Sequence, residues 1–261
     1  MESILSSKEI HFSDCRYLND SSEIFHGVNT VKRLINKKLK EISRLKKRKI
    51  LMENRLLRLQ EKMDASKFPN HYIFCLCENG DLLSQWRGYA RESCPVALKI
   101  KIDKTGKLSK HGITYLFKVI YDKKIQYKLV SAIIENYLKT KRKDVIQEFL
   151  LLNSVMWGLH IAAIYFKDAS FQEEKEWRYV YALYSPGKDE KDVNFIKKKM
   201  FYLPYMNFKF SELFPNSDGN PIKEIIVGPQ QNSLSIKSIE EYLRIKKIYI
   251  PVVASSIPYR T

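Results

Sequence analysis

The spacing of apolar residues predicts short strands in several parts of the chain. Residues 96–102 (VALKIKI) alternate apolar and polar positions, which is typical of a strand with one face in solvent. Residues 71–77 (HYIFCLC) form a continuous apolar run of strand length, which favours a buried strand. The same criteria predict further strands at 9–12, 112–121, 176–183, 223–227 and 248–253.

Apolar residues three or four apart predict helices between these strands. The stretch 31–65 has no glycine or proline, and it is either one helix about 50 Å long or a helical hairpin turning near residues 47–49. Further helices are predicted at 82–90, 125–166 and 232–245. The irregular mixture favours an α+β fold: a mixed, largely antiparallel sheet flanked by helices. We expect a single domain from 1–30 and 67–261, with 31–66 inserted as a basic helical arm.

Length and composition indicate a globular protein and argue against several classes. With 261 residues, 44% of them apolar, the chain can bury a sizeable core. No apolar run approaches twenty residues and the first ten residues are polar, so we expect neither a membrane partner nor a signal peptide. Among the four cysteines, Cys75 and Cys77 lack the spacing of a zinc knuckle. We therefore expect reduced thiols that pack as small apolar groups, no metal, and a cytoplasmic location.

Much of the net charge of +17 lies in the predicted arm. Between residues 31 and 62 there are thirteen basic and three acidic residues, which contribute +10. The arm could contact a phosphate backbone, form a coiled coil with a protein partner or a second copy, or be a solvated helix packed on the domain. It lacks aromatic residues, which argues against base stacking. The candidate nucleic-acid contacts are Lys37, Lys38, Lys40, Arg44, Lys46, Lys47, Arg48 and Lys49.

The most unusual local feature is the acidic run at 171–181 (FQEEKEWRYVY). Glu174 and Glu176 lie two apart, so on an extended segment they share one face. Their repulsion is expected to raise one pKa and to favour a cationic partner or a ligand hydroxyl. The alternative is a strand start whose glutamates form surface ion pairs with Arg178 and nearby lysines. These two glutamates are our candidate catalytic carboxylates.

Two other segments contain candidate site residues. Ser84, Trp86 and Tyr89 could line a pocket, although the two aromatic residues could equally anchor the turn in the core. Asn19, Asp20 and Glu23 could bind a ligand or help shape the cleft, or they could cap a helix. The chain contains no phosphate-binding loop, dinucleotide glycine motif or Ser-His-Asp order.

Five motifs in order resemble a bacterial family of unknown function, DUF2971. They are IHFSDCRYLNDSSE at 10–23, FCLCENGDLLSQWRGYA at 74–90, CPVALKIKID at 94–103, EKEWRYV at 174–180 and IKEIIVGP at 222–229. The resemblance covers most of the chain except 31–66. The chain departs from the family pattern at Ser21, where proline is frequent, and at Gln85 and Gly88, where Met and His are frequent. The family implies no activity.

The order of these motifs also resembles that of a more distant family, the ADP-ribosyltransferases. Their signature is a strand with Arg or His, then Ser or Tyr, then a Glu-x-Glu or lone Glu before a strand. This resemblance implies roles for His11 or Arg16, then Ser84 with Tyr89, then Glu174 and Glu176. It implies NAD as substrate, with Glu176 as the main catalytic carboxylate, Glu174 and Ser84 assisting, and Trp86, Tyr89 and Arg178 shaping the pocket. Cleavage of the nicotinamide–ribose bond develops positive charge on the sugar, which a carboxylate stabilises.

These observations lead to two hypotheses for the function, one enzymatic and one non-catalytic. In the first, the protein is an NAD-dependent, ADP-ribosyltransferase-like enzyme acting as a bacterial toxin or anti-phage effector. In the second, it is a non-catalytic module that binds nucleic acid or protein through the basic arm.

Overall fold

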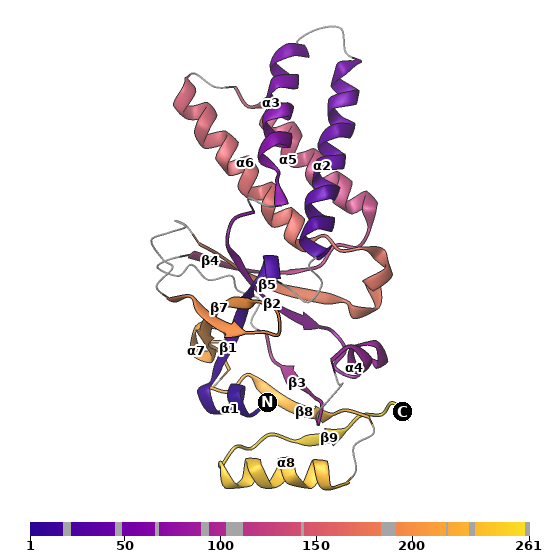
Figure 1. Cartoon of the computed structure of the whole chain (residues 1–261), viewed down its shortest axis with the longest axis vertical. Helices are drawn as coiled ribbons and strands as arrows, with labels where there is room; N and C mark the ends of the chain where they lie inside the picture. Colours follow the sequence, from indigo (N-terminus) through magenta and orange to yellow (C-terminus); the bar gives the residue numbers. More distant parts are fainter. Residues whose placement is uncertain are drawn as a thin grey trace.

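The computed structural model has the α+β fold that the sequence predicted, arranged in layers (Figure 1). It describes residues 1–17, 22–44, 49–65, 68–89, 94–102, 112–141, 144–183, 192–217, 219–229 and 233–258. In Figure 1 a layer of helices covers one face of a six-stranded sheet, and a smaller sheet with its own helix lies beyond the other face.

The central sheet places the acidic run between two long neighbours. Its strand order is β4-β5-β2-β1-β7-β6, and every pair in it is antiparallel. The strands are β1 (Glu9–Asp14), β2 (His71–Cys77), β4 (Gly112–Lys118), β5 (Glu176–Leu183), β6 (Asn194–Lys197) and β7 (Tyr202–Lys209). Because β5 pairs with β4 on one edge and β2 on the other, its backbone is fixed on both sides. Glu176, its first residue, opposes Cys77 of β2.

A second sheet corrects the expectation of a single sheet. It has the order β3-β8-β9 and consists of β3 (Val96–Ile100), β8 (Ile222–Val227) and β9 (Val252–Ala254). Helix α8 (Ser233–Ile245) connects β8 to β9, which explains their parallel pairing. Residues from α1 (Glu2–Ser7), α7 (Phe210–Leu213) and both sheets share one apolar core. The sequence pattern predicted β3 and β8, but it placed the last strand at 248–253 and missed β6 and β7 of the central sheet. The partner of each strand depends on long-range contacts that the local pattern does not record.

The helical layer includes the stretch that the sequence predicted as an arm. This stretch is a hairpin of α2 (Ser22–Ser43) and α3 (Lys49–Lys62), so the second of the two expected alternatives is confirmed. It packs with α5 (Lys123–Lys139) and α6 (Val145–Tyr165) around a core that is separate from that of the sheets. Ile35, Leu56, Leu59 and Met63 of the hairpin are completely buried. The basic residues therefore belong to helices that pack against the rest of the domain.

The predicted helical region 125–166 is two helices. Asp144 accepts a hydrogen bond from the Gln147 amide and so begins a new helix, α6, after α5 has ended. By length and composition, α6 is a helix that could cross a membrane, although core helices of soluble proteins also meet that criterion. Eight residues between Leu152 and Tyr165 are buried.

Candidate functional site

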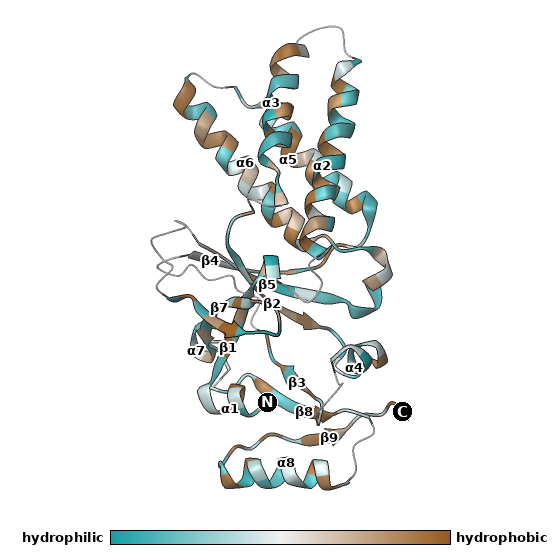
Figure 2. Ribbon diagram, viewed as in Figure 1, coloured by the Kyte–Doolittle hydropathy of each residue, from teal (hydrophilic) through white to brown (hydrophobic). Residues whose placement is uncertain are grey.

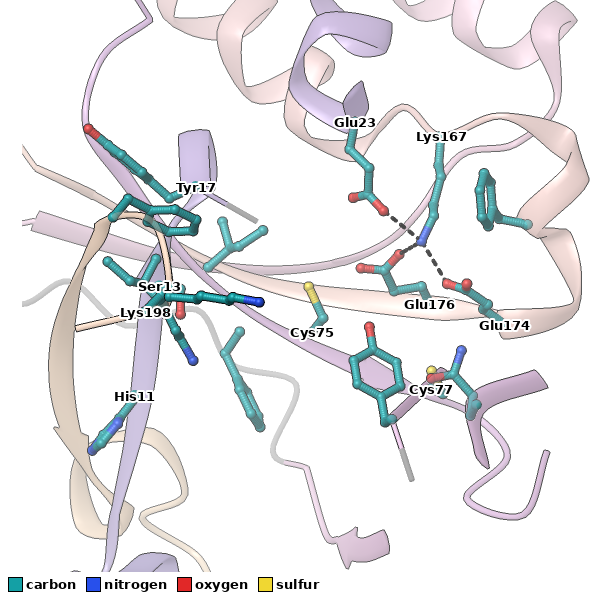
Figure 3. Close-up of a pocket in the computed structure, with 18 of the residues that line it drawn as sticks. His11, Ser13, Tyr17, Glu23, Cys75, Cys77, Lys167, Glu174, Glu176 and Lys198 are labelled. Atoms are coloured by element: carbon teal, nitrogen blue, oxygen red, sulfur yellow. Dashed lines mark hydrogen bonds and ion pairs between the residues drawn. The ribbon is translucent and has the colours of Figure 1, made fainter. Parts of the chain in front are cut away.

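A cavity of about 770 Å³ opens on the central sheet beside the start of β5. Its walls come from β1, β2, the end of α4 (Leu83–Tyr89), the segment before β5 and the turn between β6 and β7. Figure 3 shows Lys167 meeting three glutamates at one side of the cavity, with Cys75 and Cys77 on the strand beneath. The lining residues include His11, Ser13, Tyr17, Glu23, Cys75, Cys77, Gln85, Tyr89, Lys167, Phe171, Glu174, Glu176, Lys198, Lys199 and Phe201.

Local backbone geometry brings Glu174 and Glu176 to the same cation. The 3-10 helix η3 (Ala169–Glu174) begins at Asp168, whose side chain accepts a hydrogen bond from the Ser170 amide. It ends at Lys175, which has a left-handed conformation with φ of 43°. That residue turns the chain directly into β5. Glu174 is therefore the last residue of η3, and Glu176 is the first residue of β5.

Lys167 is the centre of the charged cluster, although no pattern in the sequence around it marks it as a site residue. Its Nζ lies 3.0 Å from Glu23 Oε1, 2.6 Å from Glu174 Oε2 and 2.9 Å from Glu176 Oε2. Burial would lower the pKa of this amine, but the three carboxylates outweigh burial and raise it above its usual range. Lys167 is therefore a permanent cation here and cannot act as a base.

Glu176 is held by two cations, which keep its carboxylate ionised at neutral pH. Only 3% of it is exposed. Arg178 Nε lies 2.7 Å from its Oε1, and Arg178 Nη2 lies 3.0 Å from its Oε2, which also binds Lys167. Burial would raise the pKa of Glu176, but Arg178 and Lys167 lower it to about 2. The pKa of Glu176 is therefore lowered, and not raised as the repulsion between the two glutamates predicted, because these cations dominate. The alternative of ion pairs with Arg178 and a nearby lysine is confirmed in its partners, but these pairs are buried and do not lie on the surface.

Glu23 connects the cluster to the helical layer. It lies in the first turn of α2 and contacts both cations, since its Oε2 is 2.5 Å from Arg178 Nη2 and its Oε1 binds Lys167. Arg178 also donates to the Ile164 carbonyl at the end of α6. The buried guanidinium thus joins β5 to two helices.

Glu174 differs from the other two glutamates in one respect. Its Oε2 binds Lys167, but no donor among the described residues contacts its Oε1. Both oxygens of Glu23 and of Glu176 have cationic partners. Three carboxylates and two cations leave the cluster with a formal charge of −1. A cationic or hydroxylated ligand would therefore find a free acceptor at Glu174.

The two thiols of β2 lie in the cavity wall in their neutral form. Cys75 is exposed to the cavity, although the protein around the cavity encloses it. Burial and the nearby Glu176 carboxylate raise its pKa well above the usual range. Burial and the glutamates raise the pKa of Cys77 to about 11. The expectation that the thiols pack as small apolar groups is confirmed for the buried Cys15 and is wrong for Cys75 and Cys94, which are exposed. The raised pKa values of Cys75 and Cys77 mean that neither is poised as a thiolate nucleophile.

Aromatic rings and lysines form the rest of the wall. The rings of Tyr17 and Phe201 are 5.9 Å apart between centroids. Lys198 and Lys199 lie on the turn between β6 and β7, which the Lys198 amide closes by donating to the Phe201 carbonyl at 2.8 Å. The cavity therefore combines an anionic side at the glutamates with lysines and aromatic rings in another part of its wall.

The structure brings together several of the residues selected from the sequence. Glu174, Glu176, His11 and Tyr89 all line the cavity. Arg178 lies behind it, where it positions Glu176. Glu23, which the sequence suggested as a ligand-binding residue or a helix cap, also lines the cavity, whereas Lys167 and Cys75 were not among the selected residues. The pairing of Glu23 with Lys167 depends on contacts between segments distant in the sequence, and no local pattern marks it.

Other selected residues lie elsewhere. Ser84 is exposed on α4 and is not part of the cavity wall. Trp86 is buried, donates to Asp81 at 2.7 Å, and packs where a side chain at Gly228 would otherwise lie, so it anchors α4. Arg16 forms a bidentate ion pair with Asp14, outside the cavity lining. Asn19 and Asp20 lie outside the described residues.

The basic residues of the hairpin fall into three groups. Lys38 binds Glu135 at 2.8 Å and Glu41 at 3.2 Å, and Lys37 lies 4.1 Å from the centre of the Tyr127 ring. Lys40 and Arg44 are exposed. Lys46, Lys47 and Arg48 lie outside the described residues, and the side chain of Lys49 is not described. Within the described residues, no group of three His, Cys, Asp or Glu side chains could hold a metal ion.

Comparison with known proteins supports one of the two resemblances. Residues 85–179 match the model of a family described as Protein of unknown function (DUF2971). The match supports the relationship that the motif order suggested, over a shorter part of the chain. It includes Lys167, Glu174, Glu176 and Arg178 and lies wholly outside the helical hairpin. No curated protein and no solved structure matches the chain. The resemblance to ADP-ribosyltransferases is not supported by these comparisons.

Proposed function

We propose that the protein binds NAD in this cavity and transfers its ADP-ribose group to an acceptor. The observation that carries the proposal is the free Oε1 of Glu174 beside a cluster of net charge −1. In the reaction the C1′–N bond to nicotinamide breaks, and nicotinamide leaves with the bonding electron pair. The positive charge that develops on the ribose would lie against this anionic wall. An acceptor nucleophile then bonds to C1′ and loses a proton.

The composition of the cavity wall also fits a dinucleotide. Its volume is within the range of about 300–1,000 Å³ that is usual for ligand pockets. Lys198 and Lys199 would bind the diphosphate, and Tyr17 with Phe201 offers aromatic surface for a base. His11, Tyr89 and the glutamates come from three separate parts of the chain but line one space, in agreement with the order of the sequence signature.

The proposal changes the roles that the sequence suggested for the two glutamates. Glu176 has a pKa of about 2 and no free oxygen, so it would act as a fixed charge that positions Lys167. Glu174 would bind a ribose hydroxyl or accept the proton of the acceptor. Ser84 has no part in this mechanism.

Nicotinamide release from NAD by the purified protein tests the proposal. We expect Glu174→Gln to lower the rate by about 10²–10⁴-fold, which is the usual contribution of a positioned acid or base. The matched control is Glu173→Gln, because Glu173 is its exposed neighbour outside the cavity wall and loses the same charge. Transfer of labelled ADP-ribose to components of a cell extract distinguishes a transferase from a hydrolase.

Two outcomes would contradict the enzymatic proposal. One is the absence of both nicotinamide release and label transfer with the folded wild-type protein. The other is an equal loss of rate in Glu173→Gln and Glu174→Gln. A role as a toxin or anti-phage effector further requires that expression of the wild-type protein inhibits bacterial growth and that Glu174→Gln relieves the inhibition.

A second candidate function is nucleic-acid binding through the hairpin, which the exposed Lys40 and Arg44 favour. If both contact phosphates, Lys40→Gln with Arg44→Gln should reduce the slope of log affinity against log salt by about two. The control is Lys237→Gln with Lys246→Gln on and beside α8 at the other end of the molecule. Affinity that does not depend on salt would exclude this function.

A further inference from the structure

The first turns of α6 expose a group of large apolar side chains. Val145 is 83% exposed, Ile146 71%, Phe149 60% and Leu150 61%. They occupy positions i, i+1, i+4 and i+5, and therefore share one face of the helix. From Leu152 onward the helix enters the core of the helical layer. The exposure is thus confined to the outer end of α6.

The start of α3 extends this surface. Ile50 is 75% exposed and Leu51 62%. Arg55, one turn further along α3, donates to the Leu138 carbonyl and pairs with Glu148 of α6, so the starts of α3 and α6 are held at the same end of the layer. Figure 2 shows hydrophobic colour at the outer ends of both helices. We call Ile50, Leu51, Val145, Ile146, Phe149 and Leu150 the outer apolar surface.

Basic residues lie close in sequence to the outer apolar surface. Arg44 at the end of α2 and Lys139 and Lys141 at the end of α5 are exposed. By sequence alone, the connections 45–48 and 142–143 contain five further basic residues and no acidic one. Two described acidic residues lie next to the surface on α6: Asp144, which is exposed and caps the helix by accepting from the Gln147 amide, and Glu148, which is neutralised by Arg55.

The combination of apolar and basic groups on this surface fits one class of binding partner better than the others. A second copy of this chain would bring a like-charged surface, since the net charge is +17. A nucleic acid would use the cations but would leave six large apolar side chains without a partner. An anionic lipid bilayer satisfies both, because apolar side chains enter the boundary of the acyl chains while lysine and arginine meet the headgroups.

We propose that the outer apolar surface docks the protein onto an anionic membrane surface. The sequence argued against a membrane partner because it lacks a spanning segment, but docking at the interface requires none. The proposal stands apart from the NAD reaction, since the cavity lies beside the sheet and shares no residue with this surface.

Sedimentation of the full chain with vesicles tests the proposal. We expect binding to vesicles of phosphatidylcholine mixed with phosphatidylserine, and binding at least about tenfold weaker to phosphatidylcholine alone. Ile146→Glu with Phe149→Glu should weaken binding to the mixed vesicles by about tenfold or more, because each side chain loses its burial in lipid. The matched control is Ile245→Glu on α8, which is 62% exposed at the opposite end of the molecule and should bind as the wild type does.

Three results would overturn the proposal. The first is equal binding to neutral and anionic vesicles, and the second is an equal loss of binding in Ile245→Glu. The third is a dimer of the wild-type chain that Ile146→Glu with Phe149→Glu dissociates, because the surface would then be an interface between copies. Circular dichroism establishes that each variant is folded.

Discussion

The cavity beside β5 and the outer end of the helical layer depart from the usual distribution of side chains in opposite ways. Beside the cavity, Glu176, Arg178 and Lys167 are charged but buried. At the outer end, Val145 and Ile146 are apolar but exposed. Isolated exceptions of either kind are common, whereas clusters of buried charge or of exposed apolar surface indicate a function or a partner. The cavity therefore fits a small ligand, whereas the exposed apolar surface fits a large partner.

Each region also depends on the packing beneath it. The charged cluster is stabilised because each buried carboxylate has a cationic partner, and Glu23 of α2 contributes to two of these pairs. The outer apolar surface has no such compensation within the described residues. Its helices are held in place by the core below, which includes Leu56 and Leu59. Substitutions can therefore disturb the two regions separately.

The largest expected effect is that of Arg178→Met, which removes the buried cation from the cavity cluster. Glu176 and Glu23 would each lose an ion pair in a buried setting, so the free energy of unfolding should fall by about 3–5 kcal/mol. Urea denaturation measures this change. The control is Lys38→Met, since Lys38 pairs with the partly exposed Glu135 in the helical layer. A fall for Arg178→Met as small as that for Lys38→Met would show that the buried cluster does not stabilise the fold.

A smaller effect is expected from truncation in the core of the helical layer. Leu56→Ala should lower the free energy of unfolding by about 3 kcal/mol, because Leu56 is completely buried between α3 and its neighbours. Leu57→Ala, at an adjacent site that is 44% exposed, should have much less effect. Thermal denaturation of the two variants compares them directly. Equal effects would mean that the hairpin is an arm that is not integrated into the fold.

The sequence predicted the elements better than their partners. The alternation in β3 and the apolar run of β2 are local properties, and both strands were found at the expected residues. The hairpin and the break before α6 were harder to locate, because good helix formers continue through 31–65 and only Asp144 marks the second start. The separation of the strands into two sheets depends on pairings between distant residues, such as Val96 with Val227.

In the candidate site, too, the sequence predicted individual residues better than their partners. The spacing of Glu174 and Glu176 favoured a cationic partner or a ligand hydroxyl, and Lys167 is a cation that contacts both. Its identity could not be predicted, because a single lysine after an apolar helix resembles any solvated helix end. The pairing of Glu23 with Arg178 joins residues 155 positions apart. Ser84 was selected for its position in a motif, but on α4 it faces solvent while its neighbour Gln85 lines the cavity.

The last prediction uses acid to test whether the cavity cluster contributes to stability through charge. Glu176 has a pKa of about 2 in the folded protein, below its ordinary value of 4.5. A carboxyl group with a lowered folded pKa contributes stability above its unfolded pKa and loses it as pH falls toward the folded value. Between about pH 5 and about pH 2, the free energy of unfolding should therefore fall by on the order of 2–3 kcal/mol through this group.

The matching variants isolate Glu176 from the other acids of the chain. Glu176→Gln should be less stable than the wild type at neutral pH, and its stability should change less over the acidic window because its side chain binds no proton there. Glu173→Gln, which changes an exposed residue outside the cluster, should retain the wild-type slope. Urea denaturation at several pH values gives the three curves. Parallel curves for the wild type and Glu176→Gln would show that the ionised carboxylate contributes no net stability, and the cavity cluster would then have to be understood through ligand binding alone.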